Sequence, residues 1–174
     1  MLRVVVTGGP GVGKTTVLRE LEAMGYAVVA ESAREIIRER LAQGLPPRPE
    51  PQEFAAERIR RDQEKLQRAN APKVFFDRCL VESIGMARES GLLAESEAKA
   101  MLGGLPFHPR VFVLPPWREI YVNDAERDHT FEHCQRVHRA LAEWYAACGY
   151  QVCEVPRTDP RRRAEFILGE LRVP

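Results

Sequence analysis

The chain has 174 residues, a length that fits one domain over residues 1–174 with an apolar core of its own. Its 26 basic and 25 acidic residues give a formal net charge of +1, which argues against a nucleic-acid partner or an anionic membrane surface. Four cysteines without a CxxC pair, no signal-peptide pattern and no apolar run near the roughly 20 residues of a membrane span lead us to expect a cytoplasmic protein without a transmembrane segment.

The first third of the chain alternates apolar strands with segments of helical periodicity. A β-branched run at 2–7 predicts a strand, and the periodicity after it predicts a helix at 14–24. A second strand is expected at 26–30, before a helix at 32–43. The proline-rich residues that follow cannot continue this helix, so they indicate a surface connection to a long polar helix at 52–69.

A phosphate-loop pattern lies between the first strand and the first helix, the context that separates it from a chance match. The residues expected to bind nucleotide are Gly8, Gly9, Pro10, Gly11, Val12, Gly13, Lys14, Thr15 and Thr16. The glycines let backbone N–H groups converge on a phosphate, and the helix N-terminus adds positive potential. Lys14 is expected to reach the β- and γ-phosphates of ATP or GTP, and the Thr15 hydroxyl to bind Mg²⁺. The alternative is a glycine-rich turn with an incidental lysine.

Charged residues follow the second strand, at the sheet edge where the phosphate loop is also expected. Glu31 ends that strand, Ser32 is the expected N-cap of the next helix, and Arg34 lies about one helical turn further on. Glu31 and Arg34 are therefore candidates for binding a phosphoryl acceptor, with Glu31 as a general base for its hydroxyl. The alternative is a structural ion pair of Glu31 with Arg34 or Arg78.

A third strand, expected at 74–77, ends in a second acid near the phosphate loop. This acid, Asp77, is expected to bind Mg²⁺ or its water ligands; the alternative is that it caps the following helix. Hydrolytic ATPases commonly carry another acid after the first, whereas Arg78 follows here. The Asp-Arg pair is similar to the one in nucleoside and nucleotide kinases, where the arginine contacts the acceptor or the transferring phosphoryl group.

The middle of the chain leads to an irregular segment. Helices are expected at 80–89 and 94–102, followed by a fourth strand at 110–114. The segment 117–129 mixes aromatic, acidic and cationic residues without a persistent period. Because it follows the carboxyl end of a strand, where open α/β sheets bind ligands, a mobile lid that excludes water is expected there.

Arginines of this segment are candidates for charge neutralisation during phosphoryl transfer. Arg127 is expected to act on the transition state, with Arg118 as the reserve candidate. The alternative is that both arginines are solvated loop residues.

The last third of the chain continues the alternation with a helix at 130–148, a strand at 150–155 and a helix at 160–171. Five apolar strands separated by helices predict an α/β fold of the P-loop NTPase type. We expect a five-stranded parallel sheet, helices on both of its faces, right-handed crossovers and a kinase-like strand order.

An arginine run and a pair of histidines are two further patterns, and for each of them a surface position is expected rather than a functional site. The run Arg161, Arg162 and Arg163 begins the last helix, where cations oppose the helix dipole, and is expected to be a solvated face; a phosphate or lipid contact is the alternative. His129 and His133, four residues apart, suggest zinc, but no second ligand pair accompanies them, and surface histidines are expected.

These motifs together resemble the NadR-related branch of kinase-type P-loop proteins, which includes the ribosylnicotinamide kinase domain. The matching stretches are 7–16, 31–35, 76–77, and the lid from its tryptophan to Asp124 and Arg127. The resemblance implies that Glu31 and Asp77 lie near the acceptor and the metal. It also implies that Asp124 and Arg127 close over the nucleotides and that residues 156–160 wrap the base.

The sequence therefore predicts a kinase that moves the γ-phosphoryl group of ATP to a hydroxyl of a nucleoside or related metabolite. The catalytic candidates are Lys14, Glu31, Asp77, Arg78 and Arg127. The alternative is a regulatory ATP- or GTP-binding switch with slow or no hydrolysis. A nucleic-acid-processing ATPase is disfavoured by the neutral charge balance and the lack of interleaved aromatic and basic patches. The acceptor, the choice of ATP or GTP, and the choice of monomer or homodimer stay open.

Overall fold

The computed structural model describes residues 1–121 and 130–171. Within them five parallel strands form one sheet in the order β2-β3-β1-β4-β5. The strands are β1 (Leu2–Gly8), β2 (Ala27–Val29), β3 (Lys73–Asp77), β4 (Arg110–Leu114) and β5 (Gln151–Glu154). The chain runs from β1 to one side of the sheet and later to the other, so the carboxyl end of β1 is a switch point of the kind where α/β sheets bind ligands.

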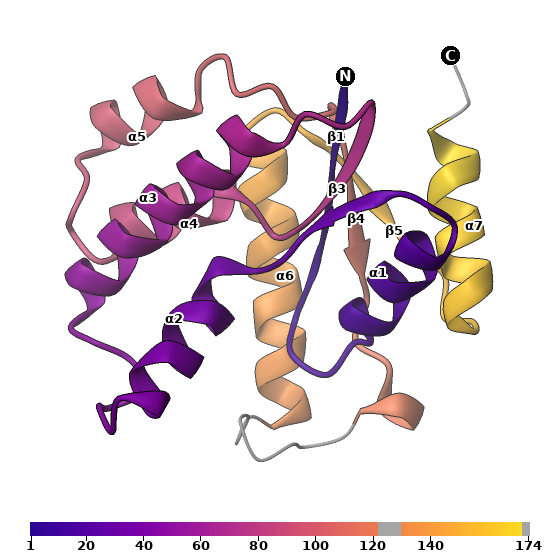
Figure 1. Cartoon of the computed structure of the whole chain (residues 1–174), viewed down its shortest axis with the longest axis horizontal. Helices are drawn as coiled ribbons and strands as arrows, with labels where there is room; N and C mark the ends of the chain where they lie inside the picture. Colours follow the sequence, from indigo (N-terminus) through magenta and orange to yellow (C-terminus); the bar gives the residue numbers. More distant parts are fainter. Residues whose placement is uncertain (122–129, 172–174) are drawn as a thin grey trace.

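Helices cover both faces of the sheet, as predicted (Figure 1). The helices are α1 (Lys14–Ala23), α2 (Ser32–Ala42), α3 (Pro51–Arg68), α4 (Leu80–Glu89), α5 (Glu95–Leu102), α6 (Phe131–Ala147) and α7 (Pro160–Glu170), with a 3₁₀-helix at Arg118–Ile120. Figure 1 shows α1 and α7 together on one side, and α2 to α5 on the other. The predicted α/β fold is therefore correct, and its strands and helices lie within two residues of the expected bounds.

The period of two along each strand divides the core between the two faces. Val4 and Val6 pack with α1 and α7, whereas Val5 between them packs with α4 and α6. All three side chains are fully buried, because helices cover the sheet on both faces. Charged residues gather at the carboxyl edge of the sheet: Glu31 follows β2, Asp77 ends β3 and Arg78 follows it.

One predicted helix cap is wrong. Ser32 is the first residue of α2, and Glu31 takes the N-cap position without a capping side-chain hydrogen bond. The Ser32 hydroxyl donates instead to Asp62 Oδ1 of α3 at 2.5 Å. The sequence pattern identified the start of the helix but not the longer-range partner that competes for the hydroxyl.

The predicted lid at 117–129 is described only to residue 121. Its predicted site residues, Asp124 and Arg127, lie outside the described residues. In the part that is described, the lid begins with the short 3₁₀-helix after β4. No helix across the described ranges is long and apolar enough to cross a membrane.

Candidate functional site

The predicted phosphate loop connects β1 to α1 and is tightly packed on its outer side. Gly11 has φ 73°, and a Cβ there would lie 2.7 Å from the Tyr121 ring. A Cβ on Gly8 would lie 2.7 Å from the Leu114 carbonyl oxygen of β4. Glycine is therefore required both for the backbone conformation and for the close approach of neighbouring elements. The loop reaches α1 with Lys14 as the first helical residue.

Lys14 lies under this loop rather than in solvent. Its side chain is buried, and Nζ donates to the carbonyl oxygens of Gly8 at 3.2 Å and Gly9 at 3.3 Å. Burial lowers the pKa of Lys14, and the positive charge of Arg78 lowers it further. The ammonium group of Lys14 thus lies at the centre of the loop. Its present acceptors are neutral carbonyl oxygens, and an anion would form stronger, charge-assisted hydrogen bonds in their place.

Arg78 joins the ends of three strands. It has φ 62°, the left-handed region that only glycine adopts easily, and its N–H donates to the Val6 carbonyl of β1 at 3.1 Å. The guanidinium Nη2 donates to the Gly8 carbonyl at 2.9 Å, Nε lies 3.1 Å from Glu31 Oε1, and Nη1 pairs with Glu82. Arg78 therefore links the phosphate loop, the end of β2 and the start of α4.

Glu31 makes both ion pairs that the sequence left as alternatives. Its carboxylate lies 3.1 Å from Arg78 Nε and 3.2 Å from Arg34 Nε. Burial works to raise the pKa of Glu31, but the charges of Arg78, Lys14 and Arg34 outweigh it and lower the pKa below its usual value. Arg34 Nη1 in turn donates to the Thr15 hydroxyl at 3.5 Å. The predicted acceptor residues and phosphate-loop residues therefore form one connected group.

Asp77 ends β3 directly beside Val6 of β1. Its side chain is buried, and Oδ1 has no hydrogen-bond partner among the residues described. Burial raises the pKa of Asp77, and the nearby Glu31 adds to the rise against the opposing charge of Lys14. Asp77 does not cap α4, whose N-cap position is Cys79 without a side-chain cap. A buried carboxylate oxygen without a partner beside the phosphate loop suits a cation ligand such as Mg²⁺.

Glu82 is a member of this group that sequence reasoning missed. It is buried in the first turn of α4 and ion-paired with Arg78. Its Oε1 accepts from the Thr7 hydroxyl of β1 at 2.5 Å and from the Tyr145 hydroxyl of α6 at 3.0 Å. A signal was present, since an acid four residues after Arg78 interrupts an otherwise apolar helix start. Glu82 holds the Arg78 guanidinium against the end of β1.

A first cavity of about 430 Å³ opens beside the phosphate loop. Its lining residues are Gly11, Val12, Gly13, Lys14, Thr15, Thr16, Arg34, Trp117, Ile120, Thr158, Asp159, Pro160 and Arg163. They include the described start of the predicted lid and three residues of the 156–160 loop that was expected to wrap a base. The cavity thus combines the backbone of the predicted phosphate loop with an aromatic wall formed by Trp117.

The expectation that the arginine run is solvated is wrong for Arg163. Arg161 and Arg162 are exposed, but Arg163 is 2% exposed and its Nη1 donates to the Val12 carbonyl of the phosphate loop at 2.9 Å. Its guanidinium also lies over the Trp117 ring, 4.7 Å from the centroid. One residue of a helical turn must face the sheet, and here that residue supports the phosphate loop.

A second cavity of about 600 Å³ adjoins the first. Its lining residues are Pro10, Lys14, Glu31, Ala33, Arg34, Ile37, Arg48, Pro49, Pro51, Phe54, Arg58, Arg78, Met86, Glu89, Ser90, His133 and Val137. Lys14 and Arg34 line both cavities. The two spaces therefore meet where the predicted phosphate-binding lysine lies.

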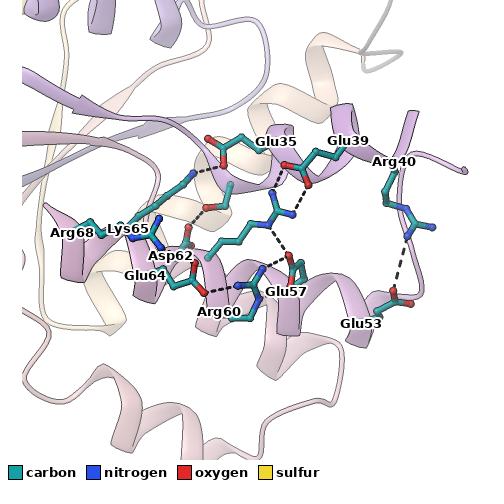
Figure 2. Close-up of polar contacts among 12 residues, drawn as sticks. Glu35, Glu39, Arg40, Glu53, Glu57, Arg60, Asp62, Glu64, Lys65 and Arg68 are labelled. Carbon is teal, nitrogen blue, oxygen red and sulfur yellow. Dashed lines mark hydrogen bonds and ion pairs between the residues drawn. The ribbon is translucent and has the colours of Figure 1, made fainter. Parts of the chain in front are cut away.

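The wall of the second cavity is held by polar contacts between α2 and α3 (Figure 2). Lys65 Nζ lies 2.7 Å from Glu35 Oε2, and Figure 2 shows these side chains pointing toward each other from the two helices. Arg61 of α3 contacts Glu39 of α2 at 2.6 Å. These pairs fix the spacing of the helices that carry Arg34 and Arg58.

The reserve lid arginine and His133, one of the histidines that suggested zinc, are not part of the first cavity. Arg118, the reserve lid arginine, lies over the Phe131 ring, 5.1 Å from its centroid, and does not line the first cavity. Within 1–121 and 130–171 no group of three or more metal-ligating side chains occurs. His133 lines the second cavity, and His129 lies outside the described residues.

Comparison with known proteins adds a family and a fold. A family model described as an AAA domain matches residues 3–163 of the chain, and a search of curated proteins found no match. The structure is similar to deoxyadenosine kinase from M. mycoides with bound dATP, with a TM-score of 0.66 and 17% identity over 99% of this chain and 100% of that one. It is also similar to shikimate kinase from Acinetobacter baumannii in complex with shikimate, with a TM-score of 0.54 and 16% identity over 98% and 93% of the two chains. At such low identities the likeness shows the fold alone, and it confirms the predicted kinase-like strand order.

Proposed function

The chain belongs to this AAA-domain family, and from that premise we propose that it is a small-molecule kinase. It would transfer the γ-phosphoryl group of ATP to a hydroxyl of a small acceptor. The solved structures most useful for comparison are kinases of deoxyadenosine and shikimate, both small hydroxylated metabolites. Within this class we place the chain in the ribosylnicotinamide-kinase-like, NadR-related branch on the motifs of the phosphate loop and the second strand end. We also propose a cytoplasmic monomer or homodimer.

The observation that carries the proposal is the meeting of two cavities at Lys14 and Arg34. A hydrolase needs space for one nucleotide and a water, whereas a kinase needs a second space for the acceptor. The second cavity is the larger of the two and is lined by Glu31 and Arg78. Two adjoining substrate spaces with cations at their junction suit transfer between bound molecules.

ATP, or GTP in its place, would occupy the first cavity. Backbone N–H groups of the loop would hold the phosphates, and Lys14 would exchange its carbonyl partners for the β- and γ-phosphates. Thr15 and Asp77 would hold Mg²⁺, for which the unpartnered Asp77 Oδ1 is the supporting observation. Bound Mg²⁺ supplies neutralisation of the phosphate charge.

The acceptor would occupy the second cavity with its hydroxyl near Glu31. The hydroxyl oxygen forms a bond to the γ-phosphorus, the bond to the bridging oxygen of ADP breaks, and the hydroxyl proton passes to Glu31 or to water. Because the surrounding cations lower the pKa of Glu31, it serves mainly to orient the hydroxyl. Arg34 and Arg78 neutralise charge on the group in transfer.

The lid completes the proposal. Residues 117–129 would close over the bound nucleotide, with Asp124 and Arg127 facing the phosphates. Trp117 and Ile120, from the described start of this segment, already line the first cavity. Closure would exclude water and so suppress hydrolysis of ATP.

The arrangement favours a kinase over the regulatory switch. A switch would present an apolar docking patch beside the lid. The exposed large apolar side chains of the described residues are Met1, Leu41, Leu45 and Met86, and none of them lies in 117–121, the described start of the lid. The ion pairs that fix Glu31, Arg34 and Arg78 at the second cavity support the kinase proposal.

The experiment that tests the proposal is Lys14→Ala. ATP affinity, measured by calorimetry, is expected to fall about 10- to 100-fold or more, since a hydrogen bond from a charged group contributes about 1.5–3 kcal/mol. Transfer of labelled γ-phosphate to a panel of nucleosides and other hydroxylated metabolites is expected to disappear. Lys99→Ala, which removes an exposed lysine from α5, is the matched control. Unchanged ATP affinity in Lys14→Ala, or wild-type hydrolysis without transfer to any acceptor, would contradict a kinase.

A further inference from the structure

Arg58 is a buried cation in the second cavity that the phosphate loop and the Glu31 ion pairs do not use. It lies on α3, is 4% exposed and lines the cavity together with Phe54 and Met86. Arginine keeps its positive charge in proteins under ordinary conditions. Burying that charge is costly unless an anion compensates it.

The protein itself supplies little compensation. No carboxylate of the described residues lies within 4.0 Å of the Arg58 guanidinium. Nη1 donates to the Met86 thioether, which is a weak acceptor, and Nε has no partner in the described part of the chain. The Phe54 ring, 5.9 Å away, adds only a weak cation–π contact.

Asp62, the acid with the strongest electrostatic effect on Arg58, already accepts hydrogen bonds from other residues. Asp62 accepts from the Ser32 hydroxyl at one oxygen and from the Ser83 hydroxyl at the other, each at 2.5 Å. Burial lowers the pKa of Arg58, and the neighbouring Arg78 lowers it further, so both effects disfavour its charge. A bound anion would reverse this imbalance.

The cavity as a whole has an excess of positive charge. Its described lining contains five cationic side chains, Lys14, Arg34, Arg48, Arg58 and Arg78. It contains two acidic ones, Glu31 and Glu89. Glu31 is engaged by Arg34 and Arg78, which leaves Arg58 as the buried donor facing the remaining space.

We propose that the acceptor carries an anionic group, a carboxylate or a phosphate monoester, in addition to its reacting hydroxyl, and that Arg58 binds this group. A guanidinium presents its N–H donors in a planar fork that matches either anion with two hydrogen bonds. The apolar wall formed by Ala33, Ile37 and Phe54 would pack on the rest of the molecule. This inference rests on the proposed kinase function, since it assigns the substrate class of the same cavity.

The test compares matched anionic and neutral ligands while a non-hydrolysable ATP analogue with Mg²⁺ fills the first cavity. One arm pairs nucleosides with their 3′-monophosphates, which keep the 5′-hydroxyl free. The other pairs hydroxycarboxylates with their methyl esters, so the two arms distinguish phosphate from carboxylate. Binding is read as a thermal shift and converted to Kd. In at least one arm we expect the anionic member to bind about 10- to 100-fold more tightly, the effect of a charge-assisted hydrogen bond.

Arg58→Met retains the length and the apolar stem but removes the charge, and it is expected to bring that ratio to about one. Arg60→Met, an exposed arginine of the same helix, is the matched control and should keep the wild-type ratio. If Arg58→Met does not fold, Arg58→Lys replaces it, and the loss of the fork should reduce the ratio at least about threefold. Equal binding of anionic and neutral members by the wild type, or an unchanged ratio in the Arg58 variant, would overturn the inference.

Failure of this inference is distinguishable from failure of the kinase proposal. Binding of the ATP analogue is measured in the same assay for the wild type and Lys14→Ala. If the analogue binds through Lys14 and neutral acceptors are phosphorylated without an anion preference, the kinase proposal stands and only the role of Arg58 is wrong. If the analogue does not bind, the kinase proposal fails as well.

Discussion

Two groups of charged residues differ in how far their ion pairs are exposed to solvent. The sheet-edge cluster consists of Lys14, Glu31, Asp77, Arg78 and Glu82. The helix ladder between α2 and α3 consists of Glu39, Glu57, Arg60, Arg61 and Glu64 (Figure 2). In the cluster the Glu82 side chain is 3% exposed, whereas in the ladder Arg60 is 54% exposed.

The difference shows that the surroundings of an ion pair matter more than its distance. The ladder pair Arg61–Glu39, at 2.6 Å, is shorter than the cluster pair Arg78–Glu31, at 3.1 Å, yet solvent competes for both of its partners. In the cluster, removal of one partner leaves largely buried groups without one of their polar contacts, and little solvent is present to replace it. The cluster should therefore be sensitive to single substitutions, and the ladder should tolerate them.

The largest effect is expected for Glu82→Ala. The substitution leaves the Arg78 guanidinium and the Thr7 and Tyr145 hydroxyls without their shared acceptor. Breaking a buried ion pair costs about 3–5 kcal/mol of the free energy of unfolding, which urea denaturation measures. Glu64→Ala in the ladder is the control, with a much smaller change. Equal losses in the two variants would remove the distinction between the groups.

Asp77→Asn is expected to raise the free energy of unfolding, by less than Glu82→Ala lowers it. Because burial raises the folded-state pKa of Asp77, the native state retains its proton to higher pH than the unfolded state does. Stability is therefore lost as the pH rises from the ordinary value of 3.8 through the raised one, and this loss should be absent in Asp77→Asn. At pH 7 the variant should therefore have a higher free energy of unfolding than the wild type.

The same variant checks the metal ligand. Mg²⁺ with ATP should raise the thermal midpoint of the wild type more than that of Asp77→Asn. A variant that loses stability at neutral pH, while keeping the full response to Mg²⁺, would show that Asp77 is a structural partner and not a ligand.

The smallest effect is expected for Glu57→Gln in the ladder. The side-chain hydrogen bond from Arg60 is the main cause that lowers the pKa of Glu57 to about 2. The carboxylate therefore stabilises the fold above the ordinary pKa of 4.5, and this contribution is lost as the pH falls from 4.5 to about 2. Solvent screening should keep it below about 1 kcal/mol at pH 7.

Salt sharpens the comparison. The difference between Glu57→Gln and the wild type should decrease further in 1 M NaCl, where the screening length is about 3 Å. The Glu82→Ala difference should change less, because Glu82, Thr7 and Tyr145 are buried and the Arg78 side chain is only 17% exposed. A ladder effect that is independent of salt would contradict the assignment of these pairs to the solvent-exposed class.

By itself, the sequence was sufficient to identify the α/β alternation, the phosphate loop and the acids at the ends of β2 and β3. These features obey local rules: β-branched runs form strands, glycines allow the loop conformation, and parallel strands end at a shared edge. Lys14, Glu31, Asp77 and Arg78 therefore came together as expected. The local rules also identified the start of α2, although Ser32 was predicted as its N-cap and is instead its first helical residue.

Only the tertiary structure decided which charged residues are buried and what they contact. Glu82 and Arg163 lie in predicted helices, but only the packing against β1 and the phosphate loop shows that both are buried. Arg58 lies among exposed arginines of α3, and only the position of α2 and α4 around it creates a cavity that a cation faces. Burial and electrostatic pairing depend on elements that are far apart in the chain, so helical periodicity cannot specify them.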